Sequence, residues 1–419
     1  MLGKLRLQLI DLVRGTKILP LLEELKKQQY LPEHELELIR KKKLENLFEK
    51  AKKNTGYYKN YHSFNEVPIL TKDIIRKNSA GLVSAAYKKK LHKKQSGGST
   101  GVSLVYYTTS ASQSYLWAGI ILSWQTAGYQ FGDKVSFIAG SSLIKTGITN
   151  KLFYKLFNID VYPATPLNET AMNAIAESMR KNKTKIIYGY ANVINELADH
   201  VKIKGPDYLP HLKGIVCTAE ILKDNVRENI ANTFGVKVVN QYGCNEGGTS
   251  AFECEYGKLH LISSKIVYEV NKEDGCIIST DLANEGFIML KYNTGDMLEF
   301  ADVKCNCGRT FPVIKRVIGR SSDIVIDKYN NRLHDSFFYF LFKHEPSVKK
   351  YQAVYNENTI TVTLQTDASK KPEYYNEYID LLKKQVKFKE YILLLNEPFI
   401  LLKNGKHKQI VDNRTTKVG

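Results

Sequence analysis

The sequence predicts an α/β protein, with a large N-terminal domain of mostly parallel sheets flanked by helices, a β-rich subdomain, and a small α+β C-terminal domain. Between residues 110 and 240, apolar segments of strand length alternate with segments of helical periodicity, which is typical of βαβ units in a covered parallel sheet. Beyond residue 260 strand-like segments dominate, and past Arg320 the pattern changes again. A chain of 419 residues is also too long for one compact core. We therefore expect two domains, residues 1–320 and 321–419.

The N-terminal part of the chain is predicted to be helical. Residues 1–30 carry leucines at a helical period with Lys and Arg between them, which predicts an amphipathic helix. Packing of this helix on the protein's own core is the favoured interpretation, and peripheral membrane contact is the alternative. Pro32 and the acidic residues after it begin a second helix that extends to about Lys53, and Thr71 is expected to cap a third.

The alternating region is expected to form helices and strands in turn. Helices are predicted over 110–127, 170–181 and 192–200, and strands over 134–139, 185–189, 212–217 and 237–242. In open parallel sheets, ligands bind beyond the carboxyl ends of the strands. The residues at those ends are therefore expected to line one crevice.

The rest of the chain is predicted to be β-rich and then mixed. Strands are expected over 259–262 and 276–280. The C-terminal domain is expected to contain strands 324–326 and 332–334 around an Asn330-Asn331 turn, helices 336–343 and 374–387, and strands 359–364 and 391–395. About 100 residues is a normal size for a small independent domain.

The composition excludes several classes of protein. No apolar run approaches the roughly 18 residues that would span a bilayer, and the first residues lack the apolar core and cleavage site of a secretory signal, so we expect a cytoplasmic protein. The formal charge of +18 suits a nucleic-acid surface, an anionic membrane or anionic substrates. Because the lysines are spread in short clusters without a nucleic-acid-binding signature, we interpret most of them as solvated surface and expect no specific nucleic-acid partner.

The stretch from Gln95 to Gly101 is the first motif with functional character. Its three glycines and three hydroxyl side chains let the backbone turn tightly and leave N–H and O–H donors free, as a polyphosphate ligand requires. A β-rich segment follows from Val102, so the stretch is predicted to join two strands of a hairpin. A mobile polar loop is an equal alternative from composition alone. The stretch is not a Walker loop, because Gly-Lys-Ser/Thr is missing.

Four later motifs follow this stretch in the chain. They are Gln-Tyr-Gly-Cys-Asn-Glu at 241–246, Tyr-Asn-Thr-Gly-Asp at 292–296, Gly-Arg-Ser-Ser-Asp at 319–323 and Asn-Gly-Lys-His-Lys at 404–408. In this order, the five motifs resemble those of the adenylate-forming superfamily, most closely its phenylacetate–CoA ligase and CapK-like capsule-synthesis branch. The resemblance spans residues 95–408, nearly the whole chain.

The resemblance implies roles for the polar residues of these motifs. Lys406 would bridge the attacking carboxylate and the α-phosphate from a small mobile domain, Glu246 would act in catalysis by binding Mg²⁺, and Asp296 would receive the ribose hydroxyls of ATP. Taken singly, these residues could be a solvated lysine, a surface glutamate and a turn aspartate. The residues expected to contact the nucleotide are Ser96, Gly97, Gly98, Ser99, Thr100, Gly101, Ala219, Glu220, Gln241, Tyr242, Gly243, Asp296 and Arg320.

The chain departs from the family pattern in two places. Members often carry a lysine after the last glycine of the loop, where this chain has Val102, so charge there must come from elsewhere or is dispensable. The usual hinge position holds Ser322 rather than a charged residue, which leaves the hinge assignment open.

The favoured function is ATP-dependent activation of a small-molecule carboxylic acid as an acyl-adenylate, followed by acyl transfer to an amine, a sugar hydroxyl or CoA. By resemblance, the setting would be bacterial surface-polysaccharide synthesis. The alternatives are a CoA ligase of the phenylacetate type and, from another class, a non-catalytic basic protein that binds nucleic acid or a membrane. The residues expected to line the substrate pocket are Tyr188, Gly189, Tyr190 and Cys244.

The last candidate site consists of Cys254, His260, Cys305 and Cys307. Without a secretory signal, the six cysteines of the chain argue against a disulfide framework and leave metal binding or simple burial. Three thiolates and one imidazole are the ligands of a closed, structural zinc site, and similar Cys/His positions occur in the branch that the chain resembles. Buried cysteines without a metal are the alternative.

Overall fold

The computed structural model divides into two compact units. The larger consists of Met1–Thr294 with Leu298–Val317, and the smaller of Gly295–Met297 with Ile318–Gly419. The residues that the structure describes are 2–96, 104–140, 147–164, 168–205, 208–321, 323–342, 345, 347–366, 371–401 and 408–414.

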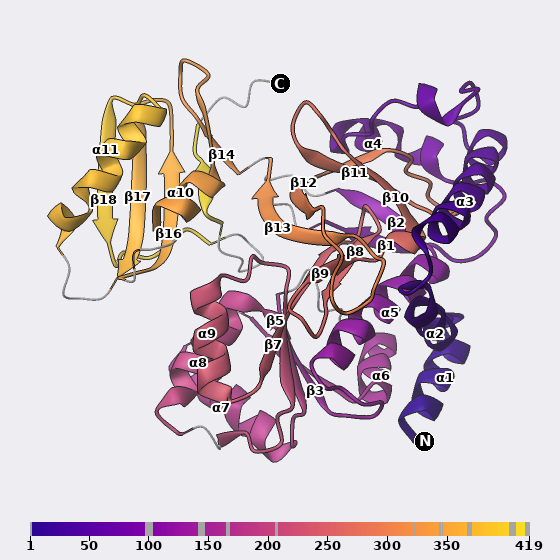
Figure 1. Cartoon of the computed structure of the whole chain (residues 1–419), viewed down its shortest axis with the longest axis horizontal. Coiled ribbons are helices and arrows are strands. Elements are labelled where there is room, and N and C mark those ends of the chain that lie inside the picture. The colour runs from indigo at the N-terminus through magenta and orange to yellow at the C-terminus, as the bar shows by residue number, and fades with distance from the viewer. Residues whose placement is uncertain are drawn as a thin grey trace. The chain divides into compact units, whose positions relative to one another are not determined.

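One sheet of 11 described strands runs through the large unit, in the order β10-β11-β12-β13-β9-β8-β7-β6-β5-β3-β4 (Figure 1). Five neighbouring strands are parallel: β3 (Val135–Ala139), β4 (Ile159–Pro163), β5 (Ile186–Tyr190), β6 (Gly214–Thr218) and β7 (Lys237–Cys244). The other strands are β8 (Thr249–Glu253), β9 (Leu259–Leu261), β10 (Ile266–Val270), β11 (Cys276–Asp281), β12 (Tyr292–Ala301) and β13 (Val313–Arg320).

The predicted fold class is confirmed. From β7 onward the sheet changes direction, because β7 pairs with β8, and β8 with β9, in antiparallel register. The β-rich region is therefore a continuation of the parallel sheet and not a separate layer. Every residue of β3, β5 and β6 is buried, as expected for parallel strands that are covered on both faces.

Helices cover the parallel strands on both sides (Figure 1). They are α5 (Ser110–Thr126), α6 (Ile148–Leu156), α7 (Glu169–Lys181), α8 (Ala191–Lys202) and α9 (Asp224–Phe234). Of these, α5, α7 and α8 were expected. Neither α6 nor α9 was predicted from the sequence, nor was the edge strand β4.

The N-terminal segment forms two helices where one was expected, α1 (Leu2–Arg14) and α2 (Ile18–Gln28). The first helix ends before Gly15, whose φ of +60° a glycine adopts at little cost. The Asp11 carboxylate then accepts hydrogen bonds from the backbone N–H groups of Ile18 and Leu19, at 2.7 and 3.1 Å. Because these N–H groups start α2, the carboxylate stabilises the new helix.

Other local predictions for the large unit are confirmed. The second helix is α3 (Glu33–Asn54), and the Thr71 side chain caps α4 (Lys72–Asn78) by accepting from the Ile74 N–H. The strands on either side of the glycine-rich stretch pair as predicted, since β1 (His92–Gln95) lies in antiparallel register with β2 (Val105–Thr108). Short 3-10 helices occur at Phe64–Glu66, Ser79–Leu82, Ser263–Lys265 and Pro372–Tyr375.

The small unit is built on a four-stranded sheet of order β18-β17-β16-β19. Its strands are β16 (Val348–Tyr355), β17 (Thr359–Thr366), β18 (Glu390–Leu395) and β19 (Ile410–Asp412), and α10 (Asp335–Phe342) and α11 (Asn376–Gln385) share its apolar core. A separate hairpin joins β14 (Ile324–Ile326) to β15 (Arg332–His334) through a turn in which Asn330 has a φ of +63°, as the Asn-Asn pair predicted.

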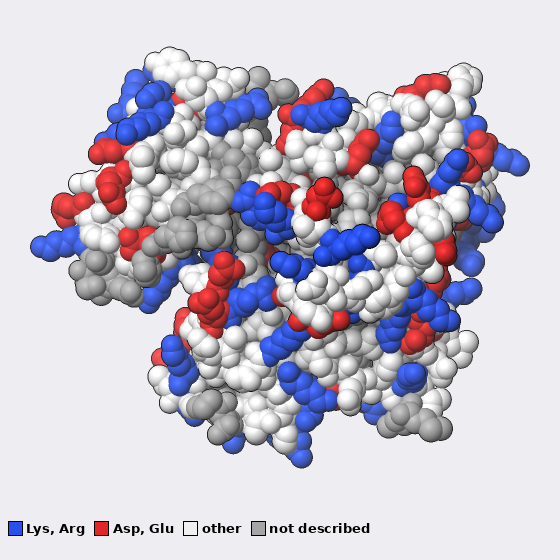
Figure 2. All heavy atoms as spheres, viewed as in Figure 1, with Lys and Arg blue, Asp and Glu red and all other residues white. Residues whose placement is uncertain are grey.

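Charged side chains of both signs are interspersed on the face of the molecule shown in Figure 2. This distribution agrees with the interpretation of most lysines as solvated surface. None of the described helices is long and apolar enough to cross a membrane.

Candidate functional site

Ser96 is hydrogen-bonded to Leu104, on the other side of the glycine-rich stretch. Its backbone N–H donates to the Leu104 carbonyl, and its Oγ accepts from the Leu104 N–H, both at 2.8 Å. The Ser96 side chain is thus occupied as an acceptor, and its hydroxyl hydrogen remains able to donate to a ligand. The loop residues Gly97, Gly98, Ser99, Thr100 and Gly101 lie outside the described residues.

The turn after β7 lies beside this hairpin. A small cavity is lined from the hairpin by Lys94, Tyr106 and Thr108, and from the turn by Asn245, Gly248 and Thr249. Burial, with a smaller effect of the Glu246 carboxylate, raises the pKa of the Tyr106 hydroxyl well above its usual value. The structure therefore brings the strands that flank the first motif beside the second motif, although Gln95 and Gln241 are 146 residues apart in the sequence.

Lys265, which was not predicted as a site residue, also lines this cavity. Only 3% of the residue is exposed. Burial lowers the pKa of the Lys265 ammonium, and the nearby Asp281 carboxylate opposes that shift. Both oxygens of Asp281 already accept other hydrogen bonds, from the Ser112 hydroxyl at 2.7 Å and the Ala283 N–H at 3.0 Å.

The Lys265 ammonium has no hydrogen-bond partner within the part of the chain that the structure describes. A buried cation without such partners is costly, and an anionic ligand would relieve that cost. The only signal in the sequence is a lysine inside the otherwise small and apolar run Ile262-Ser-Ser-Lys-Ile266, which by itself also fits a surface strand.

Asp296 and Arg320 meet in the small unit. Arg320 Nε lies 3.1 Å from Asp296 Oδ1, and the Asp296 carboxylate is largely buried while a third of the Arg320 side chain is exposed. The turn before Asp296 requires a φ of +72° at Gly295, whose carbonyl accepts from the Ser321 N–H. The two residues expected at the ribose are thus neighbours, although their motifs are separated in sequence.

Lys406 lies outside the described residues, but Ile400 and Lys408, on either side of it in the sequence, both contact Gln352 of the small unit. The Gln352 side chain, which is 1% exposed, accepts from the Ile400 N–H and donates to the carbonyls of Ile400 and Lys408, at 2.8 to 2.9 Å. Lys408 also forms an ion pair with Asp323 at 4.0 Å. Gln352, a buried polar residue in a strand, carried no sequence signal for this role.

The end of β6 has the geometry of a functional turn. Ala219 is exposed and has a φ of +65°, which costs energy for a residue with a side chain and is often found at ligand sites. The Glu220 carboxylate accepts from the Asn192 N–H at 3.0 Å, in the first turn of α8. Glu220 therefore has at least a capping role.

The other residues predicted near the ligand are mostly buried. Tyr188 stacks on Phe137 with ring centroids 4.9 Å apart, and Tyr190 is 1% exposed. A side chain at Gly189 would clash with β3, because its Cβ would stand 2.1 Å from the Ile138 carbonyl oxygen. Tyr242 and Cys244 belong to a second apolar cluster, Gly243 is exposed, and the buried Gln241 Oε1 has no described hydrogen-bond partner. Their ligand-binding roles stay predictions.

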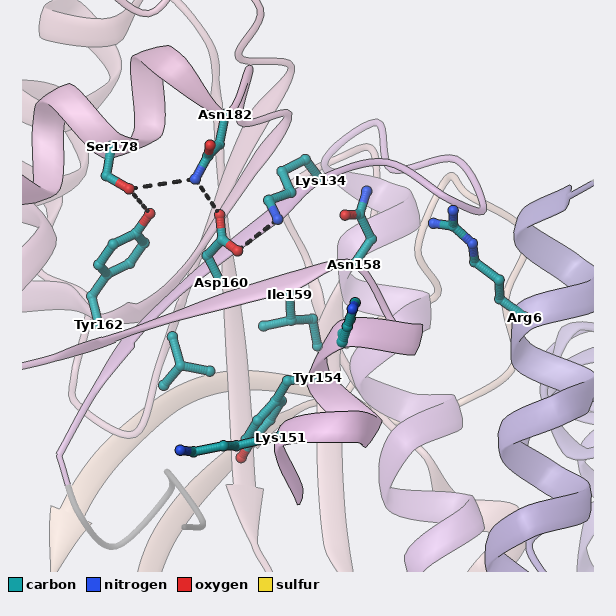
Figure 3. A pocket seen from close by; sticks show the side chains of 12 residues that line it. Arg6, Lys134, Lys151, Tyr154, Asn158, Ile159, Asp160, Tyr162, Ser178 and Asn182 are labelled. Carbon is teal, nitrogen blue, oxygen red and sulfur yellow. Dashed lines mark hydrogen bonds and ion pairs between the residues drawn. The ribbon is translucent and has the colours of Figure 1, made fainter. Parts of the chain in front are cut away.

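A larger cavity, of about 640 Å³, lies along β4, the strand at one edge of the sheet (Figure 3). Its cationic lining residues are Arg6, Lys134, Lys151 and Lys155. No described residue of the five motifs lines it.

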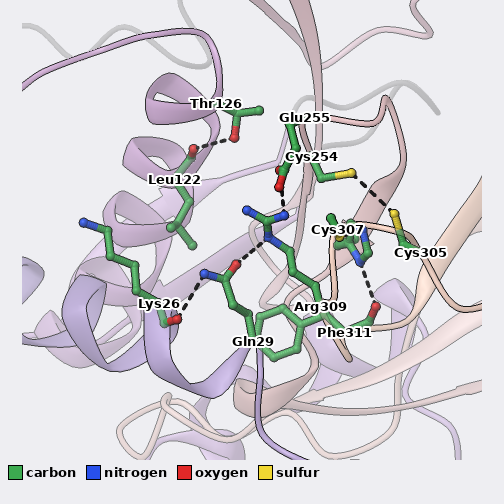
Figure 4. A network of polar contacts seen from close by, with 11 residues as sticks. Lys26, Gln29, Leu122, Thr126, Cys254, Glu255, Cys305, Cys307, Arg309 and Phe311 are labelled. Carbon is green, nitrogen blue, oxygen red and sulfur yellow. Dashed lines mark hydrogen bonds and ion pairs between the residues drawn. The ribbon is translucent and has the colours of Figure 1, made fainter.

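Cys254, His260, Cys305 and Cys307 converge in the structure. Figure 4 shows the three cysteines of this cluster. Their ligand atoms all lie within 4.8 Å of one another. Cys254 Sγ is 3.7 Å from Cys305 Sγ, and Cys307 Sγ is 3.3 Å from His260 Nε2. Tetrahedral ligands of zinc stand roughly 3.3 to 3.8 Å apart, whereas a disulfide bond would need about 2.05 Å. The donor set and its spacing therefore fit zinc.

The groups around His260 favour the neutral imidazole with Nε2 free to bind a metal. Its Nδ1 lies 2.8 Å from the Phe311 carbonyl oxygen, which accepts the Nδ1 proton and leaves Nε2 free toward the thiols. Burial lowers the pKa of His260 and so favours the neutral imidazole that binds metals. His260 comes close to Cys305 and Cys307 because β9, which carries His260, pairs with β13, and β13 begins at Val313, a few residues after Cys307.

Comparisons with known proteins agree with the motifs. No protein-family model matches the chain. Protein CapK of Staphylococcus aureus is 28% identical over 313 residues, which cover 68% of each chain. Phenylacetate-coenzyme A ligase of Thermus thermophilus is 30% identical over 146 residues, 31% of this chain and 33% of that ligase. The structure also matches the crystal structure of 2-hydroxyisobutyryl-CoA ligase in its postadenylation state, with a TM-score of 0.71. The match covers 93% of this chain and 92% of the ligase, and at 15% sequence identity it shows a shared fold.

Proposed function

Because the chain belongs to the adenylate-forming superfamily, we propose that it is an ATP-dependent ligase that activates a carboxylic acid as an acyl-adenylate. The acyl group is then transferred to an amine, hydroxyl or thiol. The observation that carries this proposal is the cavity beside the glycine-rich hairpin, where Lys94 and the buried Lys265 face the β7–β8 turn with Glu246. Cations and donors held in place before the reaction suit the charge that develops on a phosphate.

In this reaction, the carboxylate oxygen attacks the α-phosphate of ATP, the new acyl–phosphate bond forms, and the bond to pyrophosphate breaks. Ser96 and its loop would hold the β- and γ-phosphates, and Asp296 with Arg320 would bind the ribose. Glu246 would bind Mg²⁺, which would neutralise phosphate charge when bound. Lys406 would stand between the carboxylate and the α-phosphate.

Family members often carry a lysine at the position of Val102. We propose that Lys94 and Lys265 supply the positive charge that this position lacks here. Replacing Lys265 with methionine, which has a similar length without the charge, is expected to lower kcat/KM for ATP roughly 10- to 150-fold, because charge-assisted hydrogen bonds contribute about 1.5 to 3 kcal/mol. Pyrophosphate release at varied ATP concentration measures the change. Lys93→Met is the control, since Lys93 is exposed on the same strand as Lys94. Equal kinetics in Lys265→Met and the native protein would refute the assignment.

Removing the Asp296 carboxylate should weaken AMP binding by about 1.5 to 3 kcal/mol, because the ribose hydroxyls lose a charged acceptor. Asp296→Ala also releases Arg320 from its ion pair. Titration calorimetry with AMP measures the change, and Asp302→Ala, an exposed aspartate beyond the same strand, is the control. Unchanged affinity in Asp296→Ala would place the ribose elsewhere.

The acceptor is proposed from the relatives. The longer match, to CapK, supports an amine or sugar acceptor in capsular polysaccharide synthesis, and the match to phenylacetate-coenzyme A ligase supports CoA as the second candidate. Acid-dependent exchange of pyrophosphate into ATP, screened over a panel of acids, tests the first half-reaction. Loss of the adenylate on addition of amino sugars or CoA then identifies the acceptor. If no acid supports exchange, the alternative of a non-catalytic basic protein gains support.

We also propose that Cys254, His260, Cys305 and Cys307 hold a structural zinc ion. Four protein ligands leave no position for water or substrate, so the metal would tie β segments together and take no part in catalysis.

A further inference from the structure

Helix α1 has apolar residues on two faces, which is unusual for a surface helix. Leu7 and Ile10 are buried, and Gly3 packs so tightly that a Cβ there would stand 2.3 Å from the Phe131 backbone. On the other side, Leu5, Leu9, Leu12 and Val13 are 53%, 45%, 80% and 62% exposed. The first face therefore fixes α1 to the large unit, as the favoured interpretation of the sequence expected. The second face is not explained by that packing.

The four exposed residues form one row, because positions 5, 9, 12 and 13 fall within about 100° of the helix circumference. Leu152 on the neighbouring α6 is also 49% exposed. The outer face of a surface helix is normally polar, so a contiguous apolar row of this kind marks a docking surface.

Basic residues border the row. Arg6 follows Leu5 on α1 and lines the cavity at β4, and Lys151 and Lys155, one turn apart on α6, line it too. Figure 3 shows Arg6 and Lys151 projecting from the two helices around this cavity. Within the described residues, Arg6, Lys151 and Lys155 form no ion pair. The one acid of the lining, Asp160, is already neutralised, because it accepts from Lys134 at 2.6 Å and from Asn182 at 2.8 Å.

We propose that α1 and the adjoining face of α6 dock on an anionic phospholipid membrane. The leucine row would enter the boundary between headgroups and acyl chains, as interfacial amphipathic helices do, and the cavity with Arg6, Lys151 and Lys155 would receive lipid phosphates. Charge complementarity selects this occupant, because a row of leucines bordered by cations without an ion pair among the described residues matches a surface that is apolar below and anionic above. The proposal is independent of the ligase function.

Co-sedimentation of the full-length protein with vesicles tests the proposal. We expect binding to phosphatidylcholine vesicles that contain phosphatidylglycerol, little binding to phosphatidylcholine alone, and weakening when salt shortens the screening length from about 10 Å at 0.1 M to about 3 Å at 1 M. Lys151→Gln with Lys155→Gln should weaken binding roughly fivefold for each charge removed. Leu9→Gln with Leu12→Gln should weaken it about tenfold or more, because the apolar contact is lost.

Controls separate this surface from the general positive charge. Lys41→Gln with Lys42→Gln removes two exposed charges from α3, and Ile203→Gln removes an 87% exposed apolar side chain after α8. Both should bind as the native protein does, and all variants should keep their unfolding temperature. Equal loss in the α3 and α6 lysine variants would overturn the proposal. Equal binding to both kinds of vesicle would also overturn it, as would a dimer in solution that the leucine variant dissociates, since the row would then cover a second copy.

Discussion

Lys406→Ala is expected to abolish adenylate formation while nucleotide binding remains nearly intact. The lysine would act on charge that develops only as the carboxylate oxygen attacks the α-phosphate, so its loss should slow the reaction without weakening the ground state. Removing one such stabilising group typically lowers kcat about 100- to 1,000-fold. Acid-dependent pyrophosphate release gives the rate, and calorimetry with ATP gives the affinity.

Two further variants make this result specific. Lys384→Ala removes an exposed lysine from α11 of the same small unit and should leave the rate unchanged. Lys406→Arg keeps the charge but changes its shape, and should retain part of the activity if charge at this point is what matters. Near-native adenylate formation in Lys406→Ala would refute the assignment. Another cation of the small unit, such as Lys408, would then be the candidate.

Purified protein is expected to carry close to one zinc ion per chain, and Cys305→Ser should lose it together with much of the stability. The metal would join Cys254 to residues about 50 positions later, since the separation to Cys305 is 51 residues. A cross-link that closes a loop of this length contributes about 4 kcal/mol through the entropy of the unfolded chain. Thermal unfolding with and without a chelator, beside elemental analysis, measures both effects.

The pattern of losses distinguishes a structural metal from simple burial. Cys276→Ala, at a buried cysteine outside the cluster, should keep the zinc and its sensitivity to chelator. Cys305→Ser should unfold at the temperature of the chelated native protein, and its activity should decline only as it unfolds. Protein purified without chelator that contains no metal and has six freely titratable thiols would return these cysteines to the packing explanation.

Local chemistry in the sequence was sufficient for the features that depend on neighbouring residues. Thr71 caps α4 and Asn330 takes its left-handed turn as expected, because a cap and a turn are decided within a few residues. The buried strands β3, β5 and β6 were visible as apolar runs, and the alternation with helices predicted their parallel arrangement. The order of the five motifs was likewise readable without coordinates.

Long-range packing decided the rest. A sequence cannot show that the β-rich region extends the parallel sheet, or that β9 pairs with β13 and so brings Cys307 to His260. Nor can it show that the Asp11 carboxylate accepts a hydrogen bond from the first residue of α2, after α1 ends near Gly15. Burial of Lys265 beside the hairpin, and exposure of Leu12 on a helix whose other face is packed, are equally invisible, because the same residue types fit either environment. The order of the motifs was thus sufficient for the resemblance to a superfamily. The positions of the cations, thiols and exposed leucines depended on contacts between segments far apart in the chain, which only the folded structure brings together.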